Sequence, residues 1–407
     1  MKTKPIKILA ILLPVLLLIM IVLIIISMVL NSKKSGTIVA SSELESSSEI
    51  TGEGLNSETE TIVPKETEIS SEFETEEATE ETPSYTPQSA TLVFTGDILL
   101  GDRTLPLYQS SGIDGILSDD LQALMQDADI CMVNEEFPFS TRGTKAEDKQ
   151  FTFRTDPVYV SAFNDMGIDI VTLANNHVLD FGAEALLDTF DTLDQAGILY
   201  AGAGANAARA MEPQYIEANG INFGFLAASR VWPLASWEAT DTNPGCFGTY
   251  DPAKLVAAIE AAETQCDFLT VYVHWGIERQ NYPEDYQVNM AKMYIDAGAD
   301  LVIGAHPHCL QGIEYFDGKP VFYSLGNYIF GQTTDKTAAI KVNITETEDS
   351  TEAIKDLSAS YEVIPATAQN AKTSQTYGDE ANALFSYLTE ISYGASVDVN
   401  GIVTDIE

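Results

Sequence analysis

The four histidines of this chain lie in three short segments, and each segment directly follows an apolar run. The segments are 175–177, 274–278 and 306–308, and polar residues follow two earlier apolar runs in the same way, at 96–97 and 134–136. Ligands of open α/β sheets bind beyond the carboxyl ends of the strands. Imidazole, carboxylate and amide groups are also metal ligands. The pattern therefore predicts one metal site assembled from distant parts of the chain.

An uncharged and almost wholly apolar run occupies residues 8–30. As a helix it is long enough to cross a bilayer core of about 30 Å, and it exceeds the apolar core of about 7–15 residues in a cleaved signal peptide. Lysines flank both ends, and their modest bias favours residues 1–7 on the cytoplasmic side. We expect a single-pass anchor in the cell membrane with the remainder outside the cytoplasm. A cleaved signal peptide is the alternative.

Residues 31–90 are rich in Glu, Ser and Thr and poor in large apolar side chains. Such a segment cannot bury enough surface to offset the entropy cost of ordering it, so it predicts a disordered stalk. The formal net charge of the whole chain is −40. This charge excludes nucleic acid as a partner, because phosphate binding needs clustered Lys and Arg.

From residue 91 onward, apolar runs alternate with amphipathic stretches. Strand–helix alternation followed by hairpin strands predicts an α/β sandwich of mixed sheets covered by helices over residues 91–365. Asp317-Gly318 between two apolar runs predicts a hairpin turn, and residues 366–407 are expected to form a terminal helix and tail. Strands are expected at 91–96, 129–134, 168–174, 198–201, 214–218, 221–228, 267–273, 300–304, 312–316 and 320–325, with edge strands at 338–346 and 359–365. Helices are expected at 115–127, 157–166, 183–196, 251–265, 284–297 and 376–392.

The two early polar segments supply candidate oxygen ligands. Gly96 permits a tight turn after the first strand, and Asp97 then projects beyond the sheet. A turn aspartate without a ligand is the alternative. Asn134 and Glu136 share one face of an extended chain, so they can ligate together while Glu135 faces away. A solvated strand end is the alternative for this segment.

The third segment places Asn175, Asn176 and His177 directly after an apolar strand. Asn176 offers a neutral oxygen suited to a hard or borderline cation. His177 is either a ligand or a core histidine with satisfied hydrogen bonds. Asp180 either orients His177 or caps the helix that follows.

The last two segments hold the other three histidines. His306 and His308 project to one side of an extended chain that Pro307 stiffens. His274 ends another strand, and Glu278 lies four residues after it as a candidate acid, base or ligand-orienting group. Together the donors exceed what one tetrahedral ion needs. They suit two divalent cations such as Mn, Fe or Zn, which favour hydrolysis of a phosphoester or amide.

These motifs, taken in order over residues 91–330, resemble those of the CapA family, which is associated with poly-γ-glutamate capsule synthesis in bacteria. The family is in turn similar to calcineurin-like metallophosphoesterases, which have a four-layer α/β/β/α sandwich. The matching motifs are Gly96-Asp97 with Arg103, Asn134-x-Glu136, Phe153-Arg154-x-x-Pro157, Asn175-Asn176-His177-x-x-Asp180-x-Gly182, His274-Trp275-Gly276-x-Glu278, Gly304-Ala305-His306-Pro307-His308 and Ser324-Leu325-Gly326-Asn327-Tyr328-Ile329-Phe330.

The resemblance implies roles for individual residues. Glu136 would stand where the related fold has a bridging carboxylate, and Asn176-His177 would resemble its Asn-His pair. The implied metal ligands are Asp97, Asn134, Glu136, Asn176, His177, His274, His306 and His308. The implied catalytic residues are Asn175, His177, Asp180, His274 and Glu278, and the implied substrate-binding residues are Arg103, Arg154 and Asn327.

The chain departs from the phosphoesterase pattern in two motifs. Asp97 is followed by Ile98 and Leu99 in place of Asp-x-His, and Asn134-Glu135-Glu136 replaces Gly-Asp-x-x-Asp. Metal binding therefore carries over better than phosphatase activity. We expect a membrane-anchored protein that supports poly-γ-glutamate production or export, with the synthase components and the polymer as partners. The alternatives are an extracellular metal-dependent phosphoesterase and a noncatalytic component that binds the polymer or the synthase.

Overall fold

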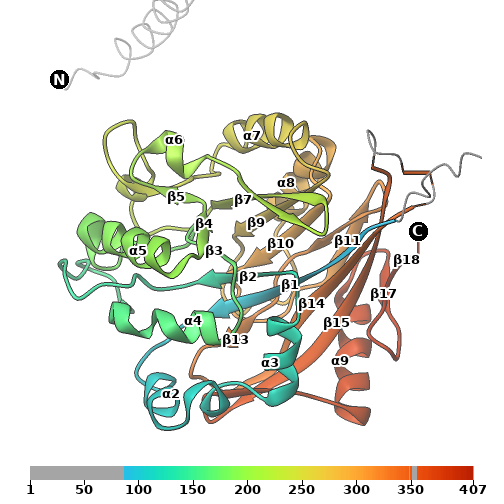
Figure 1. Ribbon diagram of the computed structural model, residues 1–407, viewed down its shortest axis with the longest axis horizontal. Helices are drawn as coiled ribbons and strands as arrows, with labels where there is room; N and C mark the ends of the chain where they lie inside the picture. The colour runs from blue at the N-terminus through green and yellow to red at the C-terminus, as the bar shows by residue number, and fades with distance from the viewer. Residues whose placement is uncertain (1–86, 348, 351–354, 407) are drawn as a thin grey trace, which may run out of the picture. The chain divides into compact units, whose positions relative to one another are not determined.

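Two β-sheets that face each other form the centre of the molecule (Figure 1). The computed structural model describes residues 87–347, 349–350 and 355–406. The first sheet has the strand order β16 (Lys372–Gln375), β15 (Leu357–Gln369), β14 (Thr334–Glu346), β1 (Ser89–Ile98), β2 (Ile130–Glu135), β3 (Ile170–Thr172) and β4 (Leu199–Ala201), with β13 (Asn327–Ile329) beside the end of β1. The second has the order β11 (Ile313–Phe316), β12 (Lys319–Phe322), β10 (Leu301–Ala305), β9 (Phe268–His274), β7 (Ile221–Ser229) and β6 (Gln214–Ala218).

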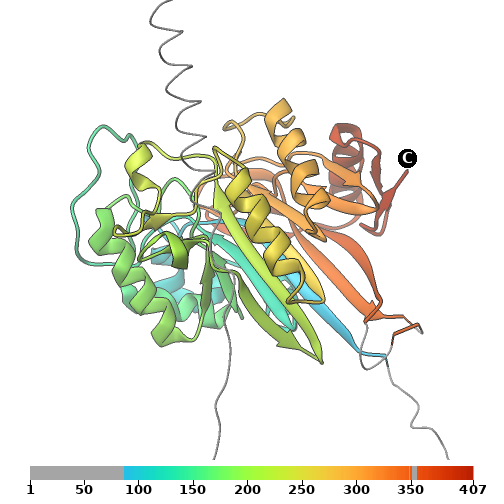
Figure 2. The ribbon, with the colours of Figure 1, turned by 90° about the horizontal axis from the view of Figure 1, so that it is seen from above.

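Helices cover the outer face of each sheet, which confirms the mixed α/β fold expected from the sequence (Figure 1). Seen from above, α7 (Ala253–Glu263) and α8 (Asp285–Asp296) lie over the strands of the second sheet (Figure 2). The first sheet is covered by α2 (Leu105–Ser111), α3 (Asp119–Gln126), α4 (Ser161–Asp165) and α5 (Gly182–Ala196). The second is covered by α6 (Ala207–Ala210), α7 (Ala253–Glu263) and α8 (Asp285–Asp296).

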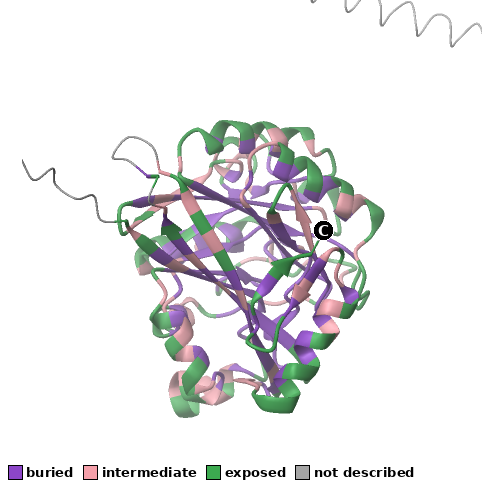
Figure 3. Cartoon of the chain, turned by 90° about the vertical axis from the view of Figure 1, so that its right-hand side faces the viewer, coloured by how far each residue is buried: buried purple, intermediate pink, exposed green. Residues whose placement is uncertain are grey.

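Alternating side chains on the strands build the layers. In β1, Leu92 and Phe94 face the core between the sheets, whereas Val93 packs against the helices. In β9, Tyr272 faces the same inter-sheet core and Val271 packs toward α7 and α8. Central strands such as β2 and β9 are accordingly buried on both faces, whereas β6, the first half of β15 and the outer surfaces of the helices are partly exposed (Figure 3). Helix α9 (Gly378–Ile391) packs its apolar face against this inter-sheet core, next to β15 and β11 (Figure 1).

Parallel pairing brings the functional segments together. Strands β1, β2 and β3 run parallel in the first sheet, and β7, β9 and β10 run parallel in the second. Tyr272 on β9 donates a hydrogen bond from its hydroxyl to the Thr95 carbonyl on β1, at 2.7 Å, which ties the two sheets together near their carboxyl ends. The polar residues near the carboxyl ends of these strands therefore lie together on one side of the sandwich.

Gly96 is needed for close packing. A Cβ atom there would lie 1.9 Å from the Gly326 carbonyl oxygen, so no side chain fits. That same oxygen accepts a hydrogen bond from the Asp97 backbone N–H, at 2.9 Å. Glycine was expected here for a tight turn. The structure instead requires glycine because the Gly326 backbone lies too close for a side chain, and this contact holds Asp97 near the carboxyl end of β1.

The C-terminal strands differ from expectation. Residues 338–346 and 359–365 were predicted as edge strands, but β14 pairs with both β1 and β15, and β15 also pairs with β16. The boundary expected at residue 365 falls within β15. Two small antiparallel pairs complete the fold, β5 (Ala203–Gly204) with β8 (Gly245–Cys246) and β17 (Ala395–Val397) with β18 (Val403–Asp405).

The predicted hairpin at Asp317-Gly318 joins β11 to β12, and both turn residues have positive φ, as a type I′ turn requires. Within the part of the chain that the structure describes, no helix is long and apolar enough to cross a membrane. The expected anchor at 8–30 lies outside the described residues, as does the expected stalk up to residue 86.

Candidate metal centre

Two overlapping groups of candidate ligand side chains lie where the carboxyl ends of the parallel strands of both sheets come together. Glu136, His274 and His306 have ligand atoms within 4.8 Å of one another, and the same holds for Asp97, Glu136 and His308. Glu136 belongs to both groups. A carboxylate shared between two sets of donors is the arrangement expected of a bridging ligand in a two-metal site.

The four strands expected from the sequence supply these ligands. Asp97 is the last residue but one of β1, Glu136 directly follows β2, His274 ends β9, and His306 directly follows β10. The His274 Nε2 atom lies 3.3 Å from Glu136 Oε1. The His274 and His306 rings have their centroids 4.8 Å apart, so the two imidazoles face one small volume.

Two asparagines hold this cluster in place. The Asn134 amide donates to Asp97 Oδ1 at 2.8 Å, and its own oxygen accepts from the Asn175 amide at 3.1 Å. Asn175 also accepts the backbone N–H groups of His177 and Val178 through its side-chain oxygen, each at 3.0 Å. Both asparagines are fully buried, and each uses both ends of its amide. Their hydrogen bonds connect the carboxyl end of β2 to the segment that follows β3.

Asn176 lies beside the first ligand group. Its side-chain oxygen is 2.8 Å from His274 Nε2, on the same nitrogen that faces Glu136. An amide oxygen, a carboxylate oxygen and an imidazole nitrogen thus lie together, and the role of Asn176 as a metal ligand stays a prediction.

Several ligand atoms are buried without a hydrogen-bond partner among the described residues. They are both carboxylate oxygens of Glu136, Oδ2 of Asp97 and Nδ1 of His306. His308 Nδ1 is 3.1 Å from Asp97 Oδ2 but makes its hydrogen bond to the Asn327 oxygen, at 2.8 Å. Buried polar atoms without partners are costly, and ligation of a cation removes that cost. The donor set therefore fits a divalent metal.

The electrostatics of the cluster favour added positive charge. Burial raises the pKa of Glu136 well above its ordinary value, and the Asp97 carboxylate raises it further. Burial, with neighbouring imidazoles, lowers the pKa of His274 well below its usual range and that of His306 to about 3. Both imidazoles are thus neutral at physiological pH, as metal ligands must be. Burial alone would lower the pKa of His308, but the Glu136 and Asp97 carboxylates raise it to about 10, so a metal ion bound at His308 would take the place of its proton.

The backbone at the last two histidines is strained. His306 and His308 have φ values of 96° and 56°, a region that residues other than glycine rarely occupy. Such strain persists only where the surrounding structure fixes it, and it concentrates at functional sites. Here it aims two imidazoles at the same carboxylate.

His177 lies next to the ligand groups but belongs to neither. Its Nδ1 is 2.7 Å from Asp180 Oδ2, and Asp180 makes no side-chain cap for α5. Of the two roles considered for Asp180, the structure thus shows the one that orients His177. Burial lowers the pKa of His177, and its hydrogen bond with Asp180 opposes the shift. Phe153 packs over the imidazole with the ring centroids 4.5 Å apart.

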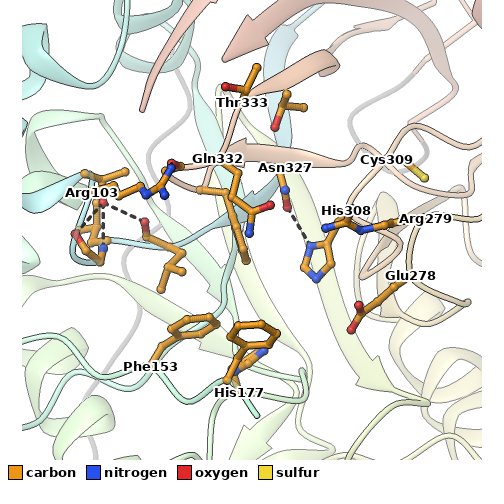
Figure 4. Close-up of a pocket in the computed structure, with 18 of the residues that line it drawn as sticks. Arg103, Phe153, His177, Glu278, Arg279, His308, Cys309, Asn327, Gln332 and Thr333 are labelled. Atoms are coloured by element: carbon orange, nitrogen blue, oxygen red, sulfur yellow. Dashed lines mark hydrogen bonds between the residues drawn. The ribbon is translucent and has the colours of Figure 1, made fainter. Parts of the chain in front are cut away.

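A cavity of about 1010 Å³ opens beside His177 and His308. Arg103 lies on one side of it, and His308, Arg279 and Glu278 lie on the opposite side (Figure 4). The candidate substrate residues Arg103, Arg154 and Asn327 all line it. Glu278 is exposed on its wall and belongs to neither ligand group.

The family model for the bacterial capsule synthesis protein PGA_cap matches residues 91–332, more than half of the chain. The chain belongs to this family. The PGA biosynthesis protein CapA of Bacillus subtilis (strain 168) is 30% identical over 256 residues, a match that covers 62% of this chain and 67% of the relative. The capsule biosynthesis protein CapA of Bacillus anthracis is 30% identical over 257 residues, covering 61% of this chain and 62% of the relative.

Solved structures resemble this PGA_cap chain at low sequence identity. A putative 5'-nucleotidase from Staphylococcus aureus in complex with alpha-ketoglutarate has a TM-score of 0.41 at 16% identity, covering 74% of this chain and 58% of that one. A phosphatase from Mycoplasma pneumoniae has a TM-score of 0.40 at 12% identity, covering 68% and 95%. These likenesses concern the fold alone.

The candidate site also includes Lys149, which the sequence did not predict as a site residue. Lys149 Nζ contacts the Asn176 carbonyl oxygen and Asp180 Oδ1 and is 3.0 Å from His177 Nδ1. Burial lowers the pKa of Lys149, while the Asp180 carboxylate opposes that shift. Lys149 follows a run of charged, exposed residues, so nothing in the sequence distinguishes it.

Glu135 is a buried acid outside the two ligand groups, and it should make the free energy of unfolding depend on pH. It lies on the face opposite Asn134, is fully buried, and neither carboxylate oxygen has a hydrogen-bond partner among the described residues. Burial raises its pKa well above the ordinary value. The folded state therefore retains a proton that the unfolded chain loses, and stability falls as pH rises from the ordinary pKa of Glu to the raised one.

We expect Glu135→Gln to be more stable than wild type above the ordinary pKa of glutamate, with a gap that widens by up to about 1.4 kcal/mol per pH unit. Urea unfolding of both proteins across a pH series, with chelator present, measures this gap. Equal pH slopes in the two proteins would show that Glu135 is ionised in the folded state.

Proposed function

We propose that this PGA_cap chain is a membrane-anchored, extracytoplasmic protein that supports poly-γ-glutamate capsule biosynthesis or export through a hydrolase-type site that holds two divalent metals. The observation that carries the proposal is the sharing of Glu136, with both oxygens unpartnered, between two groups of ligands. Family membership and the names of the two CapA relatives support the capsule role. The apolar run at 8–30 supports the anchor.

The residues that would hold the metals are Asp97, Glu136, Asn176, His274, His306 and His308. When bound, divalent cations supply Lewis acidity and lower the pKa of water, which suits hydrolysis of an amide or a phosphoester. His177 uses Nδ1 toward Asp180, so Nε2 is its nitrogen available for proton transfer in the cavity. Phe153 packs over that imidazole and limits its contact with bulk water.

The cavity is lined by four Lys or Arg side chains and by three carboxylates, those of Asp102, Glu278 and Asp335, so its walls carry a small excess of positive charge that suits an anionic ligand. Arg103, Arg154, Arg279 and Lys336 line it, and none forms an ion pair with another described residue. In a chain of net charge −40, cations without acidic partners are notable because carboxylates are abundant. They would draw carboxylate or phosphate groups toward the metal ligands.

The test is elemental analysis of the purified full-length protein, followed by turnover assays. We expect bound divalent metal, and cleavage of γ-glutamyl amides that is lost in His274→Ala. Cleavage of aryl phosphoesters alone would favour an extracellular phosphoesterase. Metal without turnover of either class would contradict the hydrolase and leave a binding component, and absence of metal would contradict the site itself. Fractionation of cells tests the anchor, because a chain that is soluble after lysis is not held by residues 8–30.

A further inference from the structure

The loop between β2 and α4 lies across the segment that carries His177. The Thr144 and Ala146 backbone N–H groups donate to the carbonyl oxygens of Phe181 and Asp180, at 3.1 and 2.8 Å. The Phe153 backbone N–H donates to Asp180 Oδ2 at 2.7 Å. The loop is thus fastened to this segment on both sides of Lys149, which limits how far the lysine can move.

The ammonium group of Lys149 is enclosed. Its side chain is 12% exposed, and its partner Asp180 is fully buried. The group touches the Asn176 carbonyl oxygen and Asp180 Oδ1, and it lies 5.1 Å from the centre of the Trp237 ring. Removing one member of a buried pair of this kind leaves the other charge uncompensated.

The hydrogen-bond roles around His177 Nδ1 can be assigned from its neighbours. Nδ1 lies 2.7 Å from Asp180 Oδ2, an acceptor, and 3.0 Å from the Lys149 ammonium, which can only donate. The ammonium has two oxygen acceptors of its own in Asn176 and Asp180. Nδ1 therefore carries the hydrogen and donates it to Asp180, while Lys149 holds the other carboxylate oxygen.

We propose that Lys149 is a positioning residue that clamps the Asn176 main chain to the Asp180 carboxylate and so holds His177 with Nε2 toward the cavity. The same clamp acts on Asn176, whose side-chain oxygen faces His274. One lysine thereby fixes both a candidate metal ligand and the imidazole beside it. The expected effect of Lys149 on kcat rests on the proposed hydrolase function, whereas its expected effect on the orientation of His177 does not.

The test compares Lys149→Met with Lys149→Arg and with the control Lys145→Met. Lys145 lies on the same loop and is exposed. The chain has four histidines, so the imidazole N–H signals of ¹⁵N-histidine-labelled, metal-free protein can be assigned with a His177→Gln variant. We expect the downfield Nδ1–H signal of His177 in wild type, Lys149→Arg and Lys145→Met, and its loss in Lys149→Met.

Kinetics supply the second measurement. We expect kcat to fall about 10–100-fold in Lys149→Met, the range typical of groups that orient metal ligands, with KM little changed and partial recovery in Lys149→Arg. A retained Nδ1–H signal in folded Lys149→Met overturns the proposal whatever the rate. If wild type turns over no substrate, the proposed function fails, but the signal still decides the role of Lys149.

Discussion

Glu136→Gln is expected to remove divalent metal from both ligand groups and to lower turnover by at least about 100-fold, beyond the effect typical of a residue that only orients ligands. The reason is that Glu136 alone belongs to both groups. Gln keeps the size of the side chain but loses the negative charge and one acceptor oxygen. Elemental analysis after dialysis against the metal, with parallel rate measurements, gives both results.

Glu135→Gln is the matched control. Glu135 is adjacent in sequence and equally buried, yet it lies on the other face of the strand end and in neither ligand group. It should keep full metal content and turnover. Metal loss in both variants would indicate a general loss of structure at the end of β2, and metal retention in Glu136→Gln would refute the bridging role.

Stability provides an independent measure of the same change. A ligand at about 100 times its Kd stabilises the folded state by about 2.7 kcal/mol per site. Wild type should gain this free energy of unfolding on addition of the metal, and Glu136→Gln should gain little. Without metal, Glu136→Gln should have the larger free energy of unfolding, because wild type must bury a carboxyl group whose pKa is raised by burial and by Asp97.

Much of this site could be predicted because strand ends carry a simple signal. Apolar runs locate the strands, and the residues directly after them, such as Asp97, His274 and His306, then fall at one edge wherever the strands run parallel. The same reasoning placed Glu135 away from the site, since neighbouring residues of a strand face opposite ways.

What escaped prediction depends on contacts between segments remote in sequence. Lys149 reaches the site because its loop bonds to the 180–181 backbone, and backbone hydrogen bonds carry no residue signature. β14 is interior because it pairs with β1 on one side and β15 on the other, which its own composition does not reveal. Gly96 was expected for a turn, but only the fold shows the Gly326 carbonyl that excludes a side chain.

The two-metal proposal makes a second prediction of large effect. His306→Ala and His308→Ala should each lose one of two metal equivalents while staying folded, because each histidine belongs to a different ligand group. Metal content of the purified variants, with near-UV circular dichroism as the measure of folding, tests this. Cys309→Ser is the control, since Cys309 lines the same cavity beside His308 and lies in neither group.

Loss of all metal from either variant would mean that the two groups form one centre, and full retention in both would refute the ligand assignment. The metal-free variants should also differ in stability. His308, with a pKa of about 10, is the cation beside Glu136 and Asp97, whereas His306, with a pKa of about 3, is neutral. Removing His308 therefore breaks its buried ion pair with Asp97 and should cost about 3 kcal/mol or more, whereas removing His306 breaks none.

This difference has a defined pH dependence. A histidine whose folded pKa is raised contributes stability that is fully present below its unfolded pKa, about 6.5, and is lost as pH rises through the folded value. For His308 the folded value is about 10. The stability gap between metal-free His306→Ala and His308→Ala should thus be largest near and below neutral pH and should close as the pH approaches 10. Urea unfolding in chelator across that range measures it, and a gap that stays constant would show that His308 carries no charge beside the two carboxylates.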